Sequence, residues 1–243
     1  MAKRMLLIFA HPDDESFALG GTIAKYTEKG VEVTLVAATK GEAGKTAGIC
    51  KPEEVGLVRE QELRRAAKVL GISEVIFLGY RDKEVPFAPP LKIVESLVRI
   101  IRDIRPQVII TFGEDGASGH RDHRAIHHFT KAAIKLAQEP VEPEWGKAYT
   151  LPRLCYVKPG WKFTKEQLQD VDYVISIAPW AERKWQAISE HRTQMGSRQK
   201  FENLEERQKQ DYLSREYFRC DQELGALPGR GEDIFQDLER VES

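Results

Sequence analysis

The sequence predicts an α/β fold, a Rossmann-like three-layer sandwich built on a mostly parallel sheet. The main observation is the alternation of strand-like and helix-like segments through the first half of the chain. Strands separated by helices form βαβ units with right-handed crossovers, which produce parallel sheets. A second observation is the apolar run at residues 5–10, typical of a strand covered on both faces. A third is a cluster of one histidine and three carboxylates, at residues 11–15, directly after that run.

The other elements of the first half follow from apolar periodicity and from the residues that stop helices. Gly30 and Gly71 each end a helical pattern, and Pro106 ends another. The stretch 40–57 contains glycines, and its length suggests a functional loop or lid. These signals predict strands at 5–10, 31–39, 75–78 and 107–112, helices at 20–29, 58–70, 91–105 and 122–137, and a turn-rich loop at 113–119.

The second half has weaker patterns. Four prolines between residues 139 and 161 predict an irregular or edge-strand segment. Nothing forces a domain boundary, so residues 1–243 are expected to form one domain, with a core at 1–137 and an elaborating segment at 138–243. The expected elements are strands at 154–157 and 173–177, charged helices at 183–191 and 203–215, and a short amphipathic helix or frayed tail at 231–243.

The composition is that of a globular protein with a substantial core. Of 243 residues, 41% are hydrophobic and 31% charged, and the net charge of −1 argues against a nucleic-acid partner. No window holds the roughly 18 apolar residues of a membrane-spanning helix, and the N-terminal apolar stretch is too short for a signal peptide. We therefore expect a cytoplasmic protein with no membrane partner; homo-oligomerisation is left open. Cys50, Cys155 and Cys220 are far apart and are expected to be free thiols.

Metal-ligating residue types follow two of the predicted strands. His11 and Asp14 are three positions apart after the first strand, and His120 and His123 have the same spacing after the fourth. If these strands are neighbours, both pairs lie at the carboxyl edge of the sheet, where ligands bind. Two histidines and one aspartate would form a three-ligand site with an open position, the arrangement of catalytic zinc. Asp13 would remain beside the metal, where a carboxylate can act as a general base.

Each of these residues also has a simpler interpretation. Histidine at a helix start is commonly a cap, and acidic residues in a first helical turn stabilise the helix dipole. The occurrence of two clusters, each after an apolar strand, favours a metal site. Gly20-Gly21 lacks the spacing of a dinucleotide fingerprint and favours a tight helix–sheet contact. A surface or core role is favoured for His127, and a structural role near the site for His191.

The chain also resembles the PIG-L/LmbE-like zinc-dependent deacetylases, which remove the acetyl group from N-acetylglucosamine-containing substrates. The most specific match is His11-Pro12-Asp13-Asp14-Glu15 followed by Gly20-Gly21-Thr22. Other family motifs follow in the same order along most of the chain. They are Thr39-Lys40-Gly41-Glu42-Ala43-Gly44, Arg59-Glu60-Gln61-Glu62-Leu63, Leu78-Gly79-Tyr80-Arg81-Asp82, His120-Arg121-Asp122-His123, and the late set Lys184, Ala187, Ile188, His191 and Gln194.

The resemblance implies a site with one Zn²⁺ per chain, for which other divalent metals can substitute. Its zinc ligands would be His11, Asp14 and His123, an assignment that spacing alone does not give. Asp13 would be the general base, and His120 would polarise the carbonyl and stabilise the oxyanion. The positions that match substrate contacts are Glu42, Arg59 and Asp82. The implied partner is a small-molecule N-acetyl amino sugar or its glycoside.

One departure and three alternatives stay open. Arg121 stands where the family usually has proline, which affects the expected substrate preference. Another metallohydrolase, such as a phosphoesterase, is possible on the same residue types, although the chain lacks a phosphate cradle. A non-catalytic zinc-binding module would not need Asp13 or His120. A deacylase of a non-sugar amide could use the same site, since members of one fold diverge in substrate.

Overall fold

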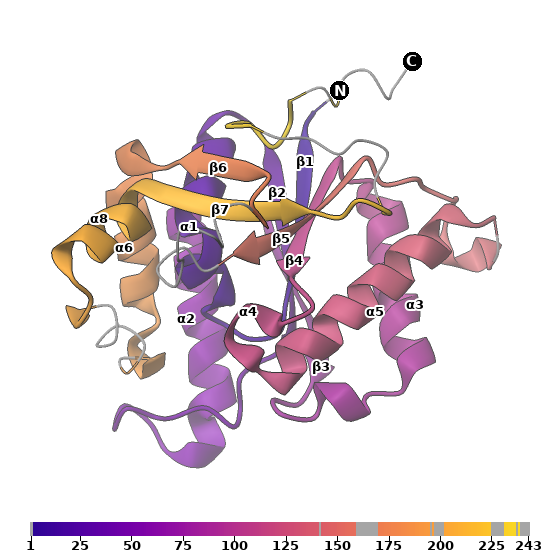
Figure 1. Ribbon diagram of the computed structural model, residues 1–243. Helices are drawn as coiled ribbons and strands as arrows, with labels where there is room; N and C mark the ends of the chain where they lie inside the picture. The colour runs from indigo at the N-terminus through magenta and orange to yellow at the C-terminus, as the bar shows by residue number, and fades with distance from the viewer. Residues whose placement is uncertain are drawn as a thin grey trace.

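The computed structural model describes residues 2–140, 142–158, 170–194, 196, 202–224, 231–236 and 238. A central sheet separates two layers of helices (Figure 1). The predicted three-layer α/β fold is therefore confirmed. Within the described ranges, every helix is too short or too polar to cross a membrane.

The sheet has seven strands in the order β3-β2-β1-β4-β5-β7-β6. The five strands from β3 to β5 are parallel, and β7 runs antiparallel to both β5 and β6. The predicted first and fourth strands are indeed neighbours, with Met5 opposite Val108. The strands are β1 (Arg4–Phe9), β2 (Glu32–Thr39), β3 (Glu74–Tyr80), β4 (Val108–Phe112), β5 (Arg153–Lys158), β6 (Tyr173–Ser176) and β7 (Arg215–Cys220).

The helices cover the two faces of the sheet. On one face α1 (Asp14–Glu28), α2 (Val55–Leu70) and α6 (Ala181–Glu190) pack against one another, and on the other α3 (Pro90–Ile104) packs against α5 (Arg121–Gln138) (Figure 1). Because both faces are covered, residues 5–9 of the central strand have no exposed surface. This rigid strand delivers His11 to the edge of the sheet. The remaining helices are α4 (Gly116–Gly119), α8 (Glu206–Ser214) and the 3-10 turns η1 (Pro52–Glu54), η2 (Val85–Phe87), η3 (Pro143–Trp145), η6 (Ala178–Trp180) and η7 (Arg192–Gln194).

Several predicted boundaries are wrong. The helix predicted at 203–215 ends at Ser214, and Arg215 begins β7, a strand that was not predicted. The helix predicted at 20–29 begins at Asp14, and the one at 58–70 begins at Val55, which shortens the predicted loop. The predicted loop at 113–119 contains the single turn α4. Residues 159–161 of the proline-rich segment, and residues 237 and 239–243 of the predicted tail, lie outside the described residues.

The pair Gly20-Gly21 marks a close contact between α1 and the late part of the chain. A Cβ atom on Gly21 would come within 2.4 Å of Cδ1 of Ile177, the residue after β6. The backbone N–H of Gly21 donates to the Glu216 carboxylate at 3.0 Å, and Lys184 Nζ lies 2.9 Å from the same carboxylate. This packing agrees with the tight contact that the sequence predicts.

Candidate active site

The candidate site lies at the carboxyl ends of β1 and β4. Strand order reverses here, because β2 and β3 lie on one side of β1 while β4 and β5 lie on the other. Ligands bind at such switch points in open α/β sheets. His11 follows β1 directly, and His120 caps the N-terminus of α5, which also carries His123. The sheet thus brings two sequence clusters together at one edge.

The three predicted metal ligands converge. His11 Nδ1 lies 3.1 Å from His123 Nε2 and 3.7 Å from Asp14 Oδ2. His123 Nε2 lies 3.3 Å from Asp14 Oδ1. A tetrahedral zinc site with bonds of about 2.0–2.1 Å holds its ligand atoms about 3.3 Å apart. The two histidine nitrogens lie close to this spacing, while Asp14 approaches His11 and His123 through different carboxylate oxygens.

Hydrogen bonds orient both imidazoles for ligation. His123 Nδ1 lies 3.0 Å from the carbonyl oxygen of Gly116, an acceptor, so Nδ1 carries the proton and Nε2 offers a lone pair. His11 Nε2 lies 3.0 Å from Asp122 Oδ2 and 3.1 Å from Asp82 Oδ1, which leaves Nδ1 free. Metal-ligating histidines commonly donate their second N–H to a carboxylate or a carbonyl in this way. The donor set therefore fits a divalent metal ion such as zinc.

Two groups of side chains around His11 have one ligand atom each within 4.8 Å of one another, and neither includes Asp14. One joins His11 to His120 and His123, and the other joins it to Asp82 and Asp122. The second group gathers on Nε2 of His11, opposite the nitrogen that faces His123. These carboxylates lie where they can hold the ring of His11 in place while Nδ1 binds a metal.

Asp122 is a site residue that the sequence did not single out. It is fully buried, and its Oδ2 accepts the N–H of Lys83 at 2.6 Å as well as the His11 contact. Its Oδ1 is buried without a hydrogen-bond partner among the described residues. The available signal was its place between His120 and His123. An acidic residue in a first helical turn is so common, however, that this signal did not distinguish it.

Burial and charge shift the pKa values of the three predicted ligands. Burial alone would lower the pKa of His11, but hydrogen bonds to Asp122 and Asp82 raise it to about 10. Burial, and then the charge on His11, lower the pKa of His123 to about 4. Burial raises the pKa of Asp14. Without a metal, positive charge therefore resides on His11, and a bound metal cation would take the place of that proton among the carboxylates.

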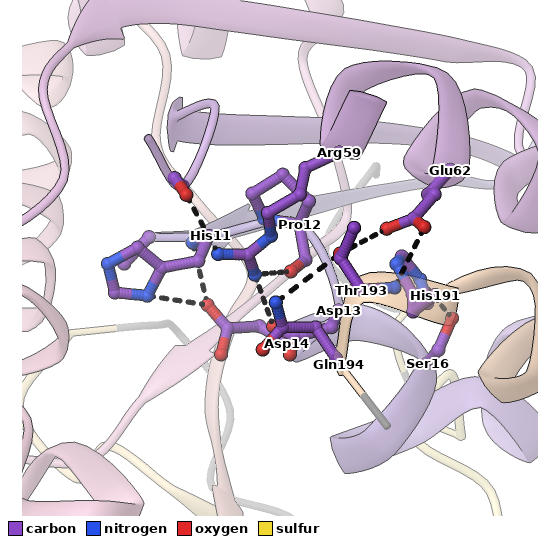
Figure 2. A network of polar contacts seen from close by, with 12 residues as sticks. His11, Pro12, Asp13, Asp14, Ser16, Arg59, Glu62, His191, Thr193 and Gln194 are labelled. Atoms are coloured by element: carbon purple, nitrogen blue, oxygen red, sulfur yellow. Dashed lines mark hydrogen bonds and ion pairs between the residues drawn. The ribbon is translucent and has the colours of Figure 1, made fainter. Parts of the chain in front are cut away.

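Asp13 lies beside this group in a strained conformation. Its φ of 109° is in the left-handed region that non-glycine residues rarely adopt. Burial raises the pKa of its carboxyl to about 6, against the lowering effect of the Arg59 guanidinium. Arg59 Nη2 lies 3.4 Å from Asp13 Oδ1 and also donates to the carbonyl oxygen of Pro12 (Figure 2). The carboxylate predicted to be a base is therefore held by a buried cation.

His120 is half-buried and close to both predicted histidine ligands. Its ring centroid lies 4.7 Å from that of His11 and 5.0 Å from that of His123. Its Nδ1 accepts the backbone N–H of Asp122 at 3.2 Å. This capping bond places the proton of the neutral ring on Nε2. Burial, and then the charges on His11 and His123, lower its pKa, so the ring is a neutral donor through Nε2.

The three predicted substrate contacts all lie near the site, and their contact with a sugar stays a prediction. Glu42 Oε2 accepts the N–H of Asp82 at 3.1 Å, and the Asp82 carboxylate contacts His11. Arg59 is buried, and its Nη1 donates to the carbonyl oxygen of Gly41 at 3.1 Å. Glu42 is partly exposed. These contacts tie the loop after β2 and the loop after β3 to the metal-side cluster.

Solved structures share this fold. The N,N'-diacetylchitobiose deacetylase of Pyrococcus horikoshii superposes with a TM-score of 0.71 at 24% identity, covering 90% of this chain and 84% of that one. The 4-carboxy-2-hydroxymuconate hydratase of Pseudomonas putida superposes equally well, with a TM-score of 0.71 at 21% identity and coverage of 96% and 99%. Since the two names denote different reactions, the fold alone does not fix the activity.

Sequence relatives are more specific. A 1D-myo-inositol 2-acetamido-2-deoxy-alpha-D-glucopyranoside deacetylase of Geodermatophilus obscurus is 30% identical, over 98% of both chains. An enzyme of the same name from Rhodococcus erythropolis is 35% identical, over 64% of this chain and 60% of its own length. The family model described as GlcNAc-PI de-N-acetylase matches residues 6–134, more than half of the chain. The chain therefore belongs to the GlcNAc-PI de-N-acetylase (PIG-L) family.

Proposed function

We propose that this protein is a zinc-dependent N-deacetylase that hydrolyses the acetamide of an N-acetylglucosamine-type sugar to acetate and a free amine. The observation that carries the proposal is the convergence of His11, Asp14 and His123, with Asp13 and His120 beside them. Family membership supports the same reaction class.

The proposed zinc ligands are His11 through Nδ1, Asp14 through its carboxylate and His123 through Nε2. A bound zinc ion supplies Lewis-acid activation of water and of the acetamide carbonyl. Three protein ligands leave a fourth position open for these oxygens. We propose one ion per chain, because the three proposed ligands form a single cluster.

Asp13 is the proposed general base. It takes a proton from the water whose oxygen bonds to the carbonyl carbon. The same proton then passes to the sugar nitrogen as the carbon–nitrogen bond breaks. A pKa raised to about 6 by burial suits a group that must accept and then release a proton near neutrality. Arg59 fixes the carboxylate through its 3.4 Å contact.

His120 is the proposed oxyanion donor. Its Nε2–H would donate to the former carbonyl oxygen while negative charge develops there. One such donor is typically worth roughly 3 kcal/mol of transition-state stabilisation. The capping bond at Nδ1 supports this role, because it holds the proton on the nitrogen that faces away from the helix backbone.

We propose an amino-sugar glycoside as the substrate class. The printed names of the relatives from Geodermatophilus and Rhodococcus support a glucosaminide of 1D-myo-inositol as the first substrate to try. Glu42, Arg59 and Asp82 are the proposed sugar-side residues. We also propose that residues 1–243 act as one domain, since β5, β6 and β7 extend the sheet that carries the site.

The test is release of free amine from a panel of acetamides. The panel contains N-acetylglucosamine, its α-glycoside of myo-inositol and N,N'-diacetylchitobiose, assayed with zinc-loaded enzyme and with enzyme dialysed against a chelator. We expect release that the chelator abolishes and added zinc restores. Asp13→Asn should keep its zinc and lose about 10²–10⁴-fold in kcat.

Three other results of this assay would each support one of the alternative functions. Hydrolysis of p-nitrophenyl phosphate without release of amine from any acetamide would indicate a phosphoesterase. Zinc bound without turnover of any substrate would indicate a binding module. Faster release from simple N-acetyl amino acids than from sugars would indicate a deacylase of non-sugar amides.

A further inference from the structure

The conformation of Asp13 needs a cause. A non-glycine residue at φ 109° is strained and persists only where its surroundings impose that conformation. Asp13 precedes the first residue of α1, so a change in its backbone conformation would also change the direction of its carboxylate. The structure shows which groups hold it (Figure 2).

The nearest of these groups is Glu15. The backbone N–H of Asp13 donates to Glu15 Oε2 at 3.2 Å. Glu15 is 1% exposed although it carries a carboxylate, so the contact is shielded from water. Its other oxygen, Oε1, accepts from the hydroxyl of Ser16 and lies 2.9 Å from Nε2 of His191. Both oxygens of Glu15 are therefore engaged.

His191 comes from the far end of the chain. It follows the last residue of α6, is 3% exposed, and lies 176 positions from Glu15. Its Nδ1 is buried without a partner among the described residues, so its polar contacts run through Nε2 to Glu15 and Ser16. The ring thus has a single polar role, which is to orient the carboxylate of Glu15.

The turn after His191 is tied to α2. Thr193 donates its backbone N–H to Glu62 Oε1 at 2.9 Å and its hydroxyl to Glu62 Oε2. Glu62 is buried and lies one helical turn after Arg59, which binds Asp13 and Pro12. One late segment, η7 with the preceding His191, therefore fixes the two helices that hold Asp13 (Figure 2).

We propose that His191 and Glu15 are positioning residues for Asp13: His191 orients Glu15, and Glu15 holds the backbone of Asp13 in its left-handed conformation. The inference rests on the proposed function in that Asp13 is taken as the base. The hydrogen bonds of His191 are with Glu15 and Ser16, so its positioning effect on the site runs through Glu15, while its charge also acts directly on Asp13. The proposal assigns a positioning role in the site to the segment that contains His191.

The first test measures kcat, KM and zinc content separately in variants of His191 and Glu15. His191→Ala should lower kcat by about 10–100-fold, because a misplacement of about 1 Å in a catalytic group has effects of that size. KM and zinc content should stay near wild type. His191→Gln should recover most of the loss, because a glutamine amide N–H can reach the position of Nε2. A double variant Glu15→Gln/His191→Ala should be no slower than the slower single variant, since both act through one contact.

The matched control is Tyr212→Phe. The Tyr212 hydroxyl donates to the carbonyl oxygen of Phe17 at 2.7 Å and so supports α1 four positions after Asp13. This variant should keep kcat within about threefold of wild type. A comparable loss of kcat in Tyr212→Phe and His191→Ala would overturn the proposal, because it would show general loosening of α1.

The second test does not depend on activity. Amide hydrogen exchange over residues 10–17 should be faster in His191→Ala than in wild type and in Tyr212→Phe. Unchanged exchange and unchanged kcat in folded His191→Ala would overturn the proposal. If wild-type protein releases no amine, the proposed function fails, while the exchange experiment still decides whether His191 holds the backbone of Asp13.

Discussion

His11 Nδ1 and His123 Nε2 face each other at 3.1 Å, although 112 positions separate the two residues. Neither nitrogen is the one that donates to the surrounding acceptors, because His11 uses Nε2 toward Asp122 and His123 uses Nδ1 toward Gly116. Without a metal, protonated His11 can donate through Nδ1 to Nε2 of neutral His123. A metal cation bound between the two nitrogens would take the place of this proton, so the edge between β1 and β4 can hold a metal.

Removal of a ligand should therefore remove the metal. We expect His123→Ala to lose most of its bound zinc and its activity, as measured by elemental analysis after gel filtration. His127→Ala is the matched control, because His127 lies on the same helix and its Nδ1 contacts the carbonyl oxygen of Phe112 and not a predicted ligand. Full zinc occupancy in His123→Ala would remove this residue from the ligand set.

Asp122 should tune the metal without binding it. Asp122→Asn keeps the size of the side chain but weakens the hydrogen-bond acceptor that faces Nε2 of His11 and orients its ring. Loss of such a partner typically costs about 10- to 100-fold in metal affinity. We expect a loss of that size in zinc affinity, measured by competition titration with a chromophoric chelator. The coordination number of the bound zinc, measured by X-ray absorption spectroscopy, should equal that of wild type. If the affinity equals that of wild type, Asp122 does not support the ligand.

The sequence could predict this site because parallel strands put their carboxyl ends at one edge. The only assumption needed was that the first and fourth strands are neighbours, and the pairing of Met5 with Val108 satisfies it. Spacing could not show that Asp82 and Asp122 both meet His11, because those contacts depend on the paths of two loops. Nor could it show the left-handed backbone of Asp13, whose contacts with Glu15 and Arg59 depend on the packing of α1 and α2.

The missed strand β7 has a different cause. Its first two residues are charged, and Glu216 is nonetheless 3% exposed. The carboxylate is buried because it accepts two backbone N–H groups of α1 and pairs with the buried Lys184. Glutamate is almost never buried without a partner, so its presence here indicates an exposed position. This hides the alternation of apolar and polar residues on which strand prediction depends.

Arg121 offers a test of substrate preference. It is the first residue of α5, where proline is well tolerated, and the extended backbone of His120 suits a residue before proline. Arg121→Pro should therefore keep the fold and the zinc. The guanidinium lies 5.9 Å from the ring centroid of Phe87 and makes no ion pair with the described residues. It is therefore available to a charged substrate.

We expect Arg121→Pro to raise KM for a glycoside with an anionic aglycone by a few-fold, the size of an exposed ion pair. KM for the uncharged inositol glycoside should change little. Arg124→Ala is the control, because Arg124 is an exposed cation three positions further along the same helix. Equal changes for the anionic and the uncharged substrate would show that Arg121 does not select charge.

Gly21 should be intolerant of any side chain. A Cβ atom there would meet Cδ1 of Ile177 at 2.4 Å and its Cβ at 2.7 Å, so the helix or β6 must move. Overpacking of this kind typically costs about 1–3 kcal/mol. Gly20→Ala is the matched variant, since a Cβ atom there would meet Cγ of Lys184 only at 3.2 Å, a milder contact. Urea unfolding should show a clearly larger loss for Gly21→Ala; equal losses would contradict this packing.

Asp221, the residue after β7, should make stability depend on pH. Burial alone would raise the pKa of its carboxyl, but hydrogen bonds from Tyr156, Lys131 and the backbone of Leu224 and Glu223 lower it to about 2. A carboxyl whose folded pKa lies below its unfolded value of 3.8 stabilises the fold above pH 3.8. That contribution is lost as pH falls from 3.8 toward 2, and it amounts to roughly 2 kcal/mol.

Asp221→Asn should therefore be destabilised by roughly 2 kcal/mol at pH 7 and by much less near pH 2. Urea unfolding at several pH values measures the difference, and zinc content at pH 7 should not change because Asp221 does not contact the predicted ligands. Asp170→Asn is the control, since its carboxylate is 48% exposed and its ion pair with Arg219 is at the surface. The loss of unfolding free energy in Asp221→Asn, relative to wild type, could instead stay constant from pH 7 to pH 2. That result would show that the stabilising hydrogen bonds do not depend on the charge of Asp221, because a neutral partner would satisfy the Tyr156 hydroxyl equally well.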